Sequence, residues 1–408
     1  MTNEPAAVTG ATTSAVPIGV YVHFPYCLSK CPYCDFASRA EAVIPQERYT
    51  EAILRELKTQ SARFAQGPKR RAVSVYFGGG TPSLWEPKLF ARVLSEIRAL
   101  FDVEAAAEIT LEANPGTTDE GRFSAFRAAG ANRLSIGVQS FDSHQLVALG
   151  RKHSSGDAVR AFQTARAAGF KNVTLDLIHG AEGHTTATAA KDARTAVELS
   201  PEHISAYALT LVGLAEEVPM AKAVRRGELV VPDDEVQEEM GHAVRAELLK
   251  GGYARYEISN YARPGFEAVH NSLYWRGLEY AAVGCGACGF VKERTDASVG
   301  KRWQNDRSPE KYMARVEETG SGEASSEQLS PEDHLKERLF TGLRLREGLD
   351  LAALERDLSL EVRARFETEI ETLVKQGIAE RSVSEASDIL RLTERGLDLH
   401  SEAALRFF

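Results

Sequence analysis

The chain has 408 residues, 43% of them apolar and 26% charged, which is the composition of a globular protein and excludes collagen, coiled coil and wholesale disorder. Its 49 basic and 58 acidic residues give a net charge of −9, so no overall positive field attracts nucleic acid or an anionic membrane. At roughly 100–200 residues per domain, this length predicts two or three domains.

The amino-terminal segment 1–16 is rich in Ala, Thr and Pro and lacks the basic start and apolar run of a secretory signal. We expect it to be a disordered leader. The most apolar later stretch, 280–290, is interrupted by glycines and is shorter than the ~18 residues that a spanning helix needs. These features predict a cytoplasmic protein without a transmembrane segment. Its five cysteines are then metal ligands, redox groups or core fillers rather than disulfides.

Six short apolar or β-branched runs alternate with longer segments of helical spacing between Gly19 and Thr210. The expected strands are Gly19–Phe24, Val73–Phe77, Ile109–Glu112, Arg133–Val138, Val173–Ile178 and His203–Leu209. The expected helices between them are Tyr49–Gln60, Pro87–Phe101, Asp119–Ala129, Asp157–Ala168 and Thr186–Leu199. Six such units in a row predict an α/β fold, with a parallel sheet and helices outside it. The spacing leaves open whether that sheet closes into a barrel.

The second half of the chain does not continue this alternation of strands and helices. The elements expected first are a helix over Asp234–Lys250, a strand near Tyr256–Ile258, an aromatic Gly-rich loop over Tyr261–Phe290, and a polar linker from Thr319 to Ser330. Those expected next are helices over Pro331–Leu345, Leu351–Leu358 and Val362–Gln376, a strand pair around Ile378–Arg381 and Leu390–Thr393, and a terminal helix. Helices followed by a two-stranded wing predict a small winged-helix domain. Its many acidic residues favour a packing or partner role over DNA binding.

The strongest chemical signal is the run Cys27-Leu-Ser-Lys-Cys31-Pro-Tyr-Cys34, which directly follows the first expected strand. Three thiolates on one loop can hold three irons of a [4Fe–4S] cluster and leave the fourth iron open. That iron can chelate the amino and carboxylate groups of S-adenosylmethionine and pass one electron into its sulfonium. A zinc site that recruits His23, and three unrelated core cysteines, are the alternatives. We favour the cluster.

From Tyr21-Val-His-Phe-Pro through its last segment, the sequence resembles the radical SAM superfamily. Within it, the similarity is to the family that contains oxygen-independent coproporphyrinogen III oxidase and the HemW-type heme chaperones. The resemblance implies a partial (β/α)6 barrel, with the cluster and S-adenosylmethionine at the carboxyl ends of its strands, where parallel sheets generally bind ligands. The expected divisions are a leader (1–16), the barrel (17–215), a barrel extension (216–325) and a winged-helix-like domain (326–408).

The resemblance also implies the residues of a cofactor site. Gly78-Gly79-Gly80-Thr81-Pro82-Ser83 resembles the family's Gly-rich turn, where missing side chains let the backbone approach the methionine moiety. The further implied contacts are Tyr21, Phe36, Glu112, Gln139, Arg151 and Asp176. Arg151 suits a carboxylate, and Asp176 can accept ribose hydroxyls. Any one of these residues could equally form a salt bridge or a turn, but their recurrence at successive strand ends favours one site.

The sequence departs from the family pattern at three places. His179-Gly180-Ala181-Glu182-Gly183 stands where relatives usually have Gly-Leu-Pro, and 212–215 replaces a Glu-Pro-Gly-Thr-like turn, so the substrate-side loops are expected to differ. Gly286-Ala287-Cys288 stands where the family has Gly-Ala-His, which creates the run Cys285-Gly-Ala-Cys288. This CxxC could bind metal or cycle between redox states, but in a Gly-rich buried loop we expect both cysteines to fill space.

Two features separate the branches of the family. The oxidases carry a further cysteine two residues after the triad, where this chain has Phe36. His270-Asn271-Ser272-Leu273-Tyr274-Trp275 matches the HNxxYW motif associated with the heme chaperones. A neutral imidazole can ligate heme iron, and the two aromatic rings offer flat faces to the macrocycle. The alternative is a loop histidine that caps a turn, with its aromatic neighbours in the core.

The sequence therefore predicts a heme chaperone that binds heme through His270 and transfers it to an acceptor protein. It would carry a [4Fe–4S] cluster and S-adenosylmethionine and would need a reducing electron donor. The alternative is an enzyme, either an oxygen-independent coproporphyrinogen III oxidase or another radical SAM enzyme. Charge disfavours a nucleic-acid partner, and no coproporphyrinogen oxidase activity is expected.

Overall fold

The structure is a computed structural model that describes residues 15–117, 119–211, 218–295 and 297–408. Most of the expected leader, the loop 212–215 and the expected boundary at 215 lie outside the described residues. Val16, which we assigned to the leader, is the first residue of strand β1. The leader can therefore extend no further than residue 15.

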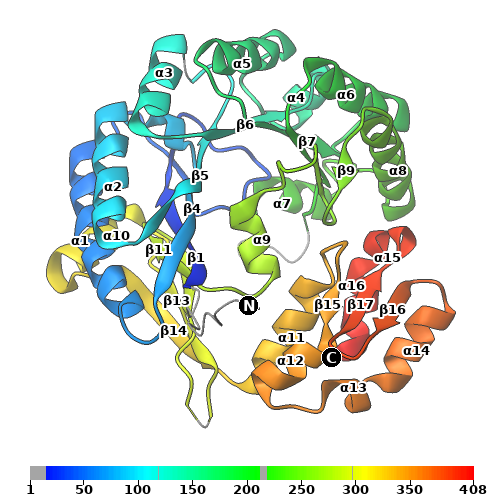
Figure 1. Cartoon of the computed structure of the whole chain (residues 1–408). Coiled ribbons are helices and arrows are strands. Elements are labelled where there is room, and N and C mark those ends of the chain that lie inside the picture. Colours follow the sequence, from blue (N-terminus) through cyan, green and yellow to red (C-terminus); the bar gives the residue numbers. More distant parts are fainter. Residues whose placement is uncertain (1–14, 118, 212–217, 296) are drawn as a thin grey trace, which may run out of the picture.

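All six expected parallel strands are confirmed (Figure 1), and each overlaps its expected range, although the third begins six residues earlier than expected. They are β1 (Val16–Phe24), β4 (Arg70–Gly79), β5 (Val103–Ala113), β6 (Arg133–Gln139), β7 (Val173–His179) and β8 (His203–Ala208). A seventh strand, β11 (Tyr280–Val283), pairs parallel to β1 from much later in the chain. The sheet order runs from β14 through β1 and β4–β8 to β9, and the described strands at its two ends are not paired with each other. The sheet is therefore an open barrel.

The crossover helices cover the outside of this sheet (Figure 1). They are α1 (Gln46–Phe64), α2 (Pro87–Leu100), α3 (Glu120–Ala129), α5 (Ser155–Ala167) and α6 (Thr186–Leu199), as the sequence predicts. Their starts follow ordinary capping chemistry: Ser154 and Asp157 form a capping box before α5. Helix α4 (Ser143–Ala148), which has six residues and is capped by Asp142, was not expected, because so short a helix shows no apolar period.

Three expectations for the second half of the chain are wrong. The segment Tyr256–Ile258 lies between two short strands, β9 (Ala254–Arg255) and β10 (Asn260–Ala262). The expected loop Tyr261–Phe290 contains helix α9 (Val269–Trp275) and strand β11. The remaining elements of this part are α7 (Pro219–Arg225), α8 (Asp234–Lys250), β12 (Cys288–Val291), β13 (Gly300–Asn305) and α10 (Pro309–Thr319). Strands of two to four residues are too short for periodicity to detect.

The third error is the expected linker Thr319–Ser330, most of which is the edge strand β14 (Glu323–Leu329). This strand is exposed along nearly its whole length, so its polar sequence hides the β pattern. It pairs antiparallel to β13, and Arg302 forms an ion pair with its cross-strand partner Glu327 at 2.7 Å. Charged side chains on an edge strand also discourage pairing with other chains.

The last part of the chain is a helical unit with a small sheet, in which a third strand that was not expected joins the predicted pair. Its elements are α11 (Pro331–Gly342), β15 (Leu349–Asp350), α12 (Leu351–Leu358), α13 (Val362–Arg365), α14 (Glu367–Lys375), β16 (Ala379–Val383), β17 (Asp388–Leu392), α15 (Glu394–Asp398) and α16 (His400–Ala404). The expected helix Val362–Gln376 is divided at Phe366, whose φ of −112° is outside the helical range. Buried leucines of α11 and β17 form one core with Phe290 from the barrel side.

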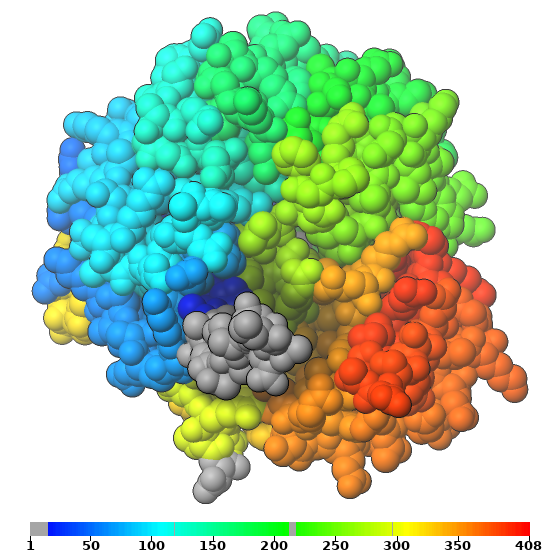
Figure 2. All heavy atoms as spheres, viewed as in Figure 1, coloured from blue at the N-terminus to red at the C-terminus, as the bar shows by residue number. Residues whose placement is uncertain are grey.

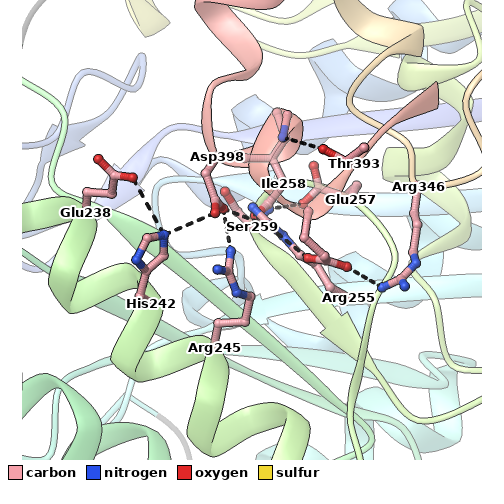
Figure 3. A network of polar contacts seen from close by, with 12 residues as sticks. Glu238, His242, Arg245, Arg255, Glu257, Ile258, Ser259, Arg346, Thr393 and Asp398 are labelled. Atoms are coloured by element: carbon pink, nitrogen blue, oxygen red, sulfur yellow. Dashed lines mark hydrogen bonds and ion pairs between the residues drawn. The ribbon is translucent and has the colours of Figure 1, made fainter. Parts of the chain in front are cut away.

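An ionic cluster fixes this unit against the barrel (Figure 3). Asp398 accepts a hydrogen bond from Arg255 at 2.9 Å and also pairs with Arg245 of α8. Arg344 pairs with Glu257, which is fully buried, at 2.9 Å. Because these partners come from distant segments and are largely shielded from water, they determine how the two parts are placed relative to each other.

Candidate functional site

The three cysteines of the CxxxCxxC run lie on the loop that follows β1, in which Tyr26–Cys27 and Arg39–Ala40 form the short strands β2 and β3. All three are reduced, half-buried and line a cavity of about 320 Å³. Thr81 donates a hydrogen bond to Cys27 Sγ at 3.4 Å, and Arg151 donates one to Cys31 Sγ at 3.5 Å. Such donors stabilise sulfur ligands in their thiolate form.

In the part of the chain that the structure describes, the three thiols do not form a site for a single ion. Within the described part of the chain, no three His, Cys, Asp or Glu side chains are close enough together to hold one metal ion. A cubane holds its cysteines farther apart than a tetrahedral zinc does, because each thiolate binds a different iron. His23, the extra ligand of the zinc alternative, has both ring nitrogens within hydrogen-bond distance of a partner, namely the Tyr21 hydroxyl and the Ala37 carbonyl, each at 3.0 Å.

The Gly-rich turn after β4 packs directly against the cysteine loop. Gly79 has a φ of 116°, which favours glycine. A Cβ on Gly80 would lie 2.8 Å from the Tyr26 carbonyl oxygen and 3.0 Å from Cys27 Sγ. Only a residue without a side chain leaves the space between the turn and the cysteine loop open. The turn therefore fits the close approach of backbone to ligand that its sequence implies.

Glu112 is held at the carboxyl end of β5 by two donors. Tyr76 donates its hydroxyl to Oε1 at 2.7 Å, and the Gly79 amide donates to Oε2 at 2.9 Å. Burial raises the pKa of Glu112 to about 7 in spite of these hydrogen bonds. A buried carboxyl so close to ionisation at neutral pH favours a cationic ligand beside it.

Arg151 lies on the opposite wall with part of its guanidinium free. Its Nη2 donates to Asn114 Oδ1 at 2.6 Å and to the Gly137 carbonyl at 2.7 Å. Its Nε is buried and has no hydrogen-bond partner among the described residues. An orphaned donor of this kind fits an anionic group in the cavity. Sequence reasoning missed Asn114, although it stands two residues after Glu112, on the same face of the strand end.

Two further implied residues complete the wall. Asp176 accepts from Ser135 Oγ at 3.2 Å, and burial raises its pKa to about 6. Gln139 has a φ of 68° at the end of β6, and Tyr207 donates to its Oε1 at 3.5 Å. A positive φ in a glutamine is a strained conformation of the kind that collects at binding sites.

The cavity thus brings together nearly all of the implied site. The lining includes Cys27, Cys31, Cys34, Phe36, Gly79, Gly80, Thr81, Glu112, Gln139, Arg151 and Asp176. Phe36 is 63% exposed at the cavity mouth. Tyr21 is not among the lining residues: its ring stacks on Tyr76 at 6.1 Å, and its hydroxyl bonds His23 Nδ1 at 3.0 Å. It supports the wall from behind.

His270 lies on α9, which is inside the ring of strands (Figure 1). The side chain is 1% exposed, and both ring nitrogens have partners. Nδ1 lies 2.8 Å from Ser74 Oγ, and Nε2 lies 2.7 Å from the Tyr274 hydroxyl. Heme iron can therefore reach this ring only if one of these hydrogen bonds breaks, and ligation by His270 stays a prediction.

The two later cysteines differ from each other. Cys285 is fully buried, and its amide donates to the Tyr49 hydroxyl at 3.0 Å, so it fills space as expected. Cys288 is exposed, and the expectation that it fills a buried loop is wrong. It is the first residue of strand β12, and the three residues that follow it in the strand are buried.

Comparison with known proteins identifies the class. The model of the radical SAM superfamily matches residues 21–196, and that of the HemN C-terminal domain matches residues 329–399. The crystal structure of coproporphyrinogen III oxidase (HemN) from Escherichia coli has the same fold, with a TM-score of 0.78 over 96% of this chain and 90% of that one at 22% identity. The chain is a member of the radical SAM superfamily, which implies a [4Fe–4S] cluster and S-adenosylmethionine.

Curated relatives narrow this class to a family. The heme chaperone HemW of Haemophilus influenzae is 40% identical over 73% of this chain and 76% of its own length. That of Escherichia coli is 41% identical over 67% and 70%, and that of Mycobacterium tuberculosis (strain H37Rv) is 38% identical over 83% and 84%. The chain belongs to the HemW family. No helix in the described residues is long and apolar enough to cross a membrane.

Proposed function

We propose that this protein is a heme chaperone, which binds heme and passes it to an acceptor protein. The observation that carries the proposal is its 38–41% identity, over two thirds or more of the chain, to proteins named heme chaperones. Phe36 supports it, since the related oxidases have a cysteine at this position. We place the protein in the cytoplasm, where a reducing electron donor is available to it.

In this proposal Cys27, Cys31 and Cys34 hold three irons of the cluster, and S-adenosylmethionine occupies the cavity beside it. The bound cluster supplies one electron to the sulfonium. Arg151, with its unpartnered Nε, pairs the carboxylate of the ligand. Glu112 ionises opposite its cationic groups, and Asp176 accepts from its ribose hydroxyls.

The cofactor cavity and the HNxxYW helix share a wall, which supports a link between cofactor state and heme handling. Tyr76 bonds Glu112 on one side, and its ring lies 5.1 Å from the ring of His270 on the other. Asn271, the second residue of the motif, lines the cofactor cavity itself. Glu112 and His270 of α9 are therefore separated by a single ring, that of Tyr76.

Titration of the anaerobically reconstituted protein with ferric heme tests the proposal. We expect saturable, stoichiometric binding that shifts the Soret band. Transfer to an apo-hemoprotein is then followed at increasing acceptor concentration, with heme bound to serum albumin as the control for simple release. A chaperone hands heme over through a complex, so the rate rises with acceptor concentration. A rate independent of acceptor, or no saturable heme binding, would contradict the function.

A further inference from the structure

A second pocket lies apart from the cofactor cavity, between α9, strands β11–β13 and α11. It has a volume of about 220 Å³ and is lined by Tyr274, Gly277, Leu278, Tyr280, Phe290, Arg302, His334, Glu337, Arg338 and Thr341. None of these residues lines the cofactor cavity. Figure 2 shows a hollow between the yellow-green segment that contains α9 and the orange start of the last unit.

His334 of α11 is an unsatisfied buried histidine in this pocket. It is 3% exposed, and neither ring nitrogen has a hydrogen-bond partner in the described residues. Its ring stacks on Phe290 at 5.5 Å, and Nδ1 lies 3.9 Å from Glu337 Oε2. Burial lowers the pKa of His334 to about 4, so the ring is neutral at physiological pH. A neutral imidazole without hydrogen bonds has a lone pair free for a ligand.

An unpaired cation shares the pocket. Arg338 donates to the Trp275 carbonyl at 3.1 Å, but no carboxylate of the described residues lies within ion-pairing distance of it. Burial lowers the pKa of this guanidinium to about 10. A Cβ on Gly277 would lie 2.3 Å from Arg338 Cδ, so the missing side chain at 277 makes room for Arg338. A half-buried arginine without a counter-ion favours an anionic ligand.

The other walls are flat and apolar. Tyr274 and Tyr280 meet edge to face with ring centroids 4.6 Å apart, and Tyr280 lies 6.4 Å from Phe290. Tyr274 is also the hydroxyl partner of His270, so the HNxxYW motif reaches this pocket through its tyrosine. Aromatic walls, a cation and a free imidazole together match a planar metalloporphyrin with carboxylate side chains.

We propose that this pocket, once its wall has opened, receives heme with His334 Nε2 as the axial ligand of the iron and Arg338 paired with a propionate. The proposal rests on the function proposed above and names its ligand. Nδ1 faces Glu337, and a carboxylate behind a metal-binding histidine fixes the tautomer that leaves Nε2 free. His270 lacks this freedom, because both its nitrogens are already bonded.

The pocket must open before heme can enter, since both ring nitrogens of His334 are shielded from solvent. The contact at the edge is the ion pair between Arg302 and Glu337, whose side chains are 34% and 35% exposed. A partly exposed ion pair opens at little cost. Its opening leaves Glu337 free to bond Nδ1, while Arg302 keeps its ion pair with Glu327.

The test compares His334→Ala with His270→Ala in the full-length, anaerobically reconstituted protein. His400→Gln is the matched control, since His400 is a buried histidine of the same unit that lies outside the pocket. Iron and sulfide contents show that each variant is folded. We expect His334→Ala to lose the imidazole signature in the Soret region and in the EPR spectrum of ferric heme, with affinity lower by roughly tenfold or more.

Added imidazole separates ligation from a packing defect. In His334→Ala it should enter the vacated space and restore the wild-type spectrum, which a merely structural role would not allow. His270→Ala and His400→Gln should keep the imidazole signature. A wild-type spectrum in His334→Ala, or loss of the signature in His270→Ala alone, would overturn the assignment while leaving the heme chaperone intact. Absence of heme binding by the wild type would instead remove the function on which it rests.

Discussion

Substitution of Gly80 by alanine tests how tightly the Gly-rich turn packs against the cysteine loop. The new Cβ would lie 2.8 Å from the Tyr26 carbonyl oxygen, 2.9 Å from the Pro25 carbonyl carbon and 3.0 Å from Cys27 Sγ. Two of these three atoms belong to the backbone, which has no rotamer to change. Hydrogen bonds from the Gly80 amide to Phe24 at 2.7 Å and from the Thr81 amide to Tyr26 at 2.9 Å prevent the turn from retreating.

The cysteine loop must therefore move by a few tenths of an ångström, and overpacking of this kind costs about 1–3 kcal/mol. We expect Gly80→Ala to melt at a lower temperature and to lose iron to a chelator faster than the wild type. Gly241→Ala is the control, because Gly241 lies within α8, has no clash and gains helix propensity. Equal melting temperature and iron retention in Gly80→Ala and the wild type would refute the packing argument.

Three other predictions concern the cofactor site. Replacing any one of the three cluster cysteines by alanine should abolish the iron–sulfur absorption, whereas the control Cys285→Ala should keep its iron content. Retention of iron and sulfide in any of the three cysteine variants would count against these residues as the cluster ligands. Because the folded pKa of Glu112 is raised to about 7, its burial favours the protonated form. The wild-type apoprotein should therefore lose stability relative to the Glu112→Gln apoprotein as pH rises from about 4 through about 7, and the melting temperatures of the two should converge at lower pH. A constant difference between the two melting temperatures across this range would be evidence against the raised pKa. Arg151→Gln should weaken S-adenosylmethionine binding by about 1–3 kcal/mol, measured by titrating the ligand against the EPR spectrum of the reduced cluster. Unchanged affinity would show that Arg151 does not contact the ligand.

The parallel sheet and its crossover helices could be predicted because their signal is local and repeated. Each long helix shows an apolar period, and β-branched runs mark the buried strands. The polar edge strand β14 and the short helix α9 carried no such signal, and both owe their form to neighbours that are distant in sequence. The pairing of β11 with β1 joins residues more than 250 positions apart, which no local pattern reveals.

Some residues of the site could likewise be predicted from local motifs, and others could not. Cys27, Glu112 and Arg151 were found because family motifs carry them at strand ends, where the fold brings side chains together. Tyr76 and Asn114 hold these residues in place, yet a tyrosine within a strand and an asparagine just after one look like ordinary packing and turn residues. The state of His270 could not be predicted at all, since Ser74 and Tyr274 approach it only in the folded chain.

The choice between chaperone and oxidase is decided by incubating the anaerobically reconstituted protein with coproporphyrinogen III, S-adenosylmethionine and a reductant, followed by mass analysis of the porphyrins. Phe36 in place of the oxidases' cysteine predicts that coproporphyrinogen III is recovered unchanged. The same preparation should bind heme stoichiometrically, which shows that it is competent. Conversion to protoporphyrinogen IX would contradict the proposed function and make the protein an oxidase.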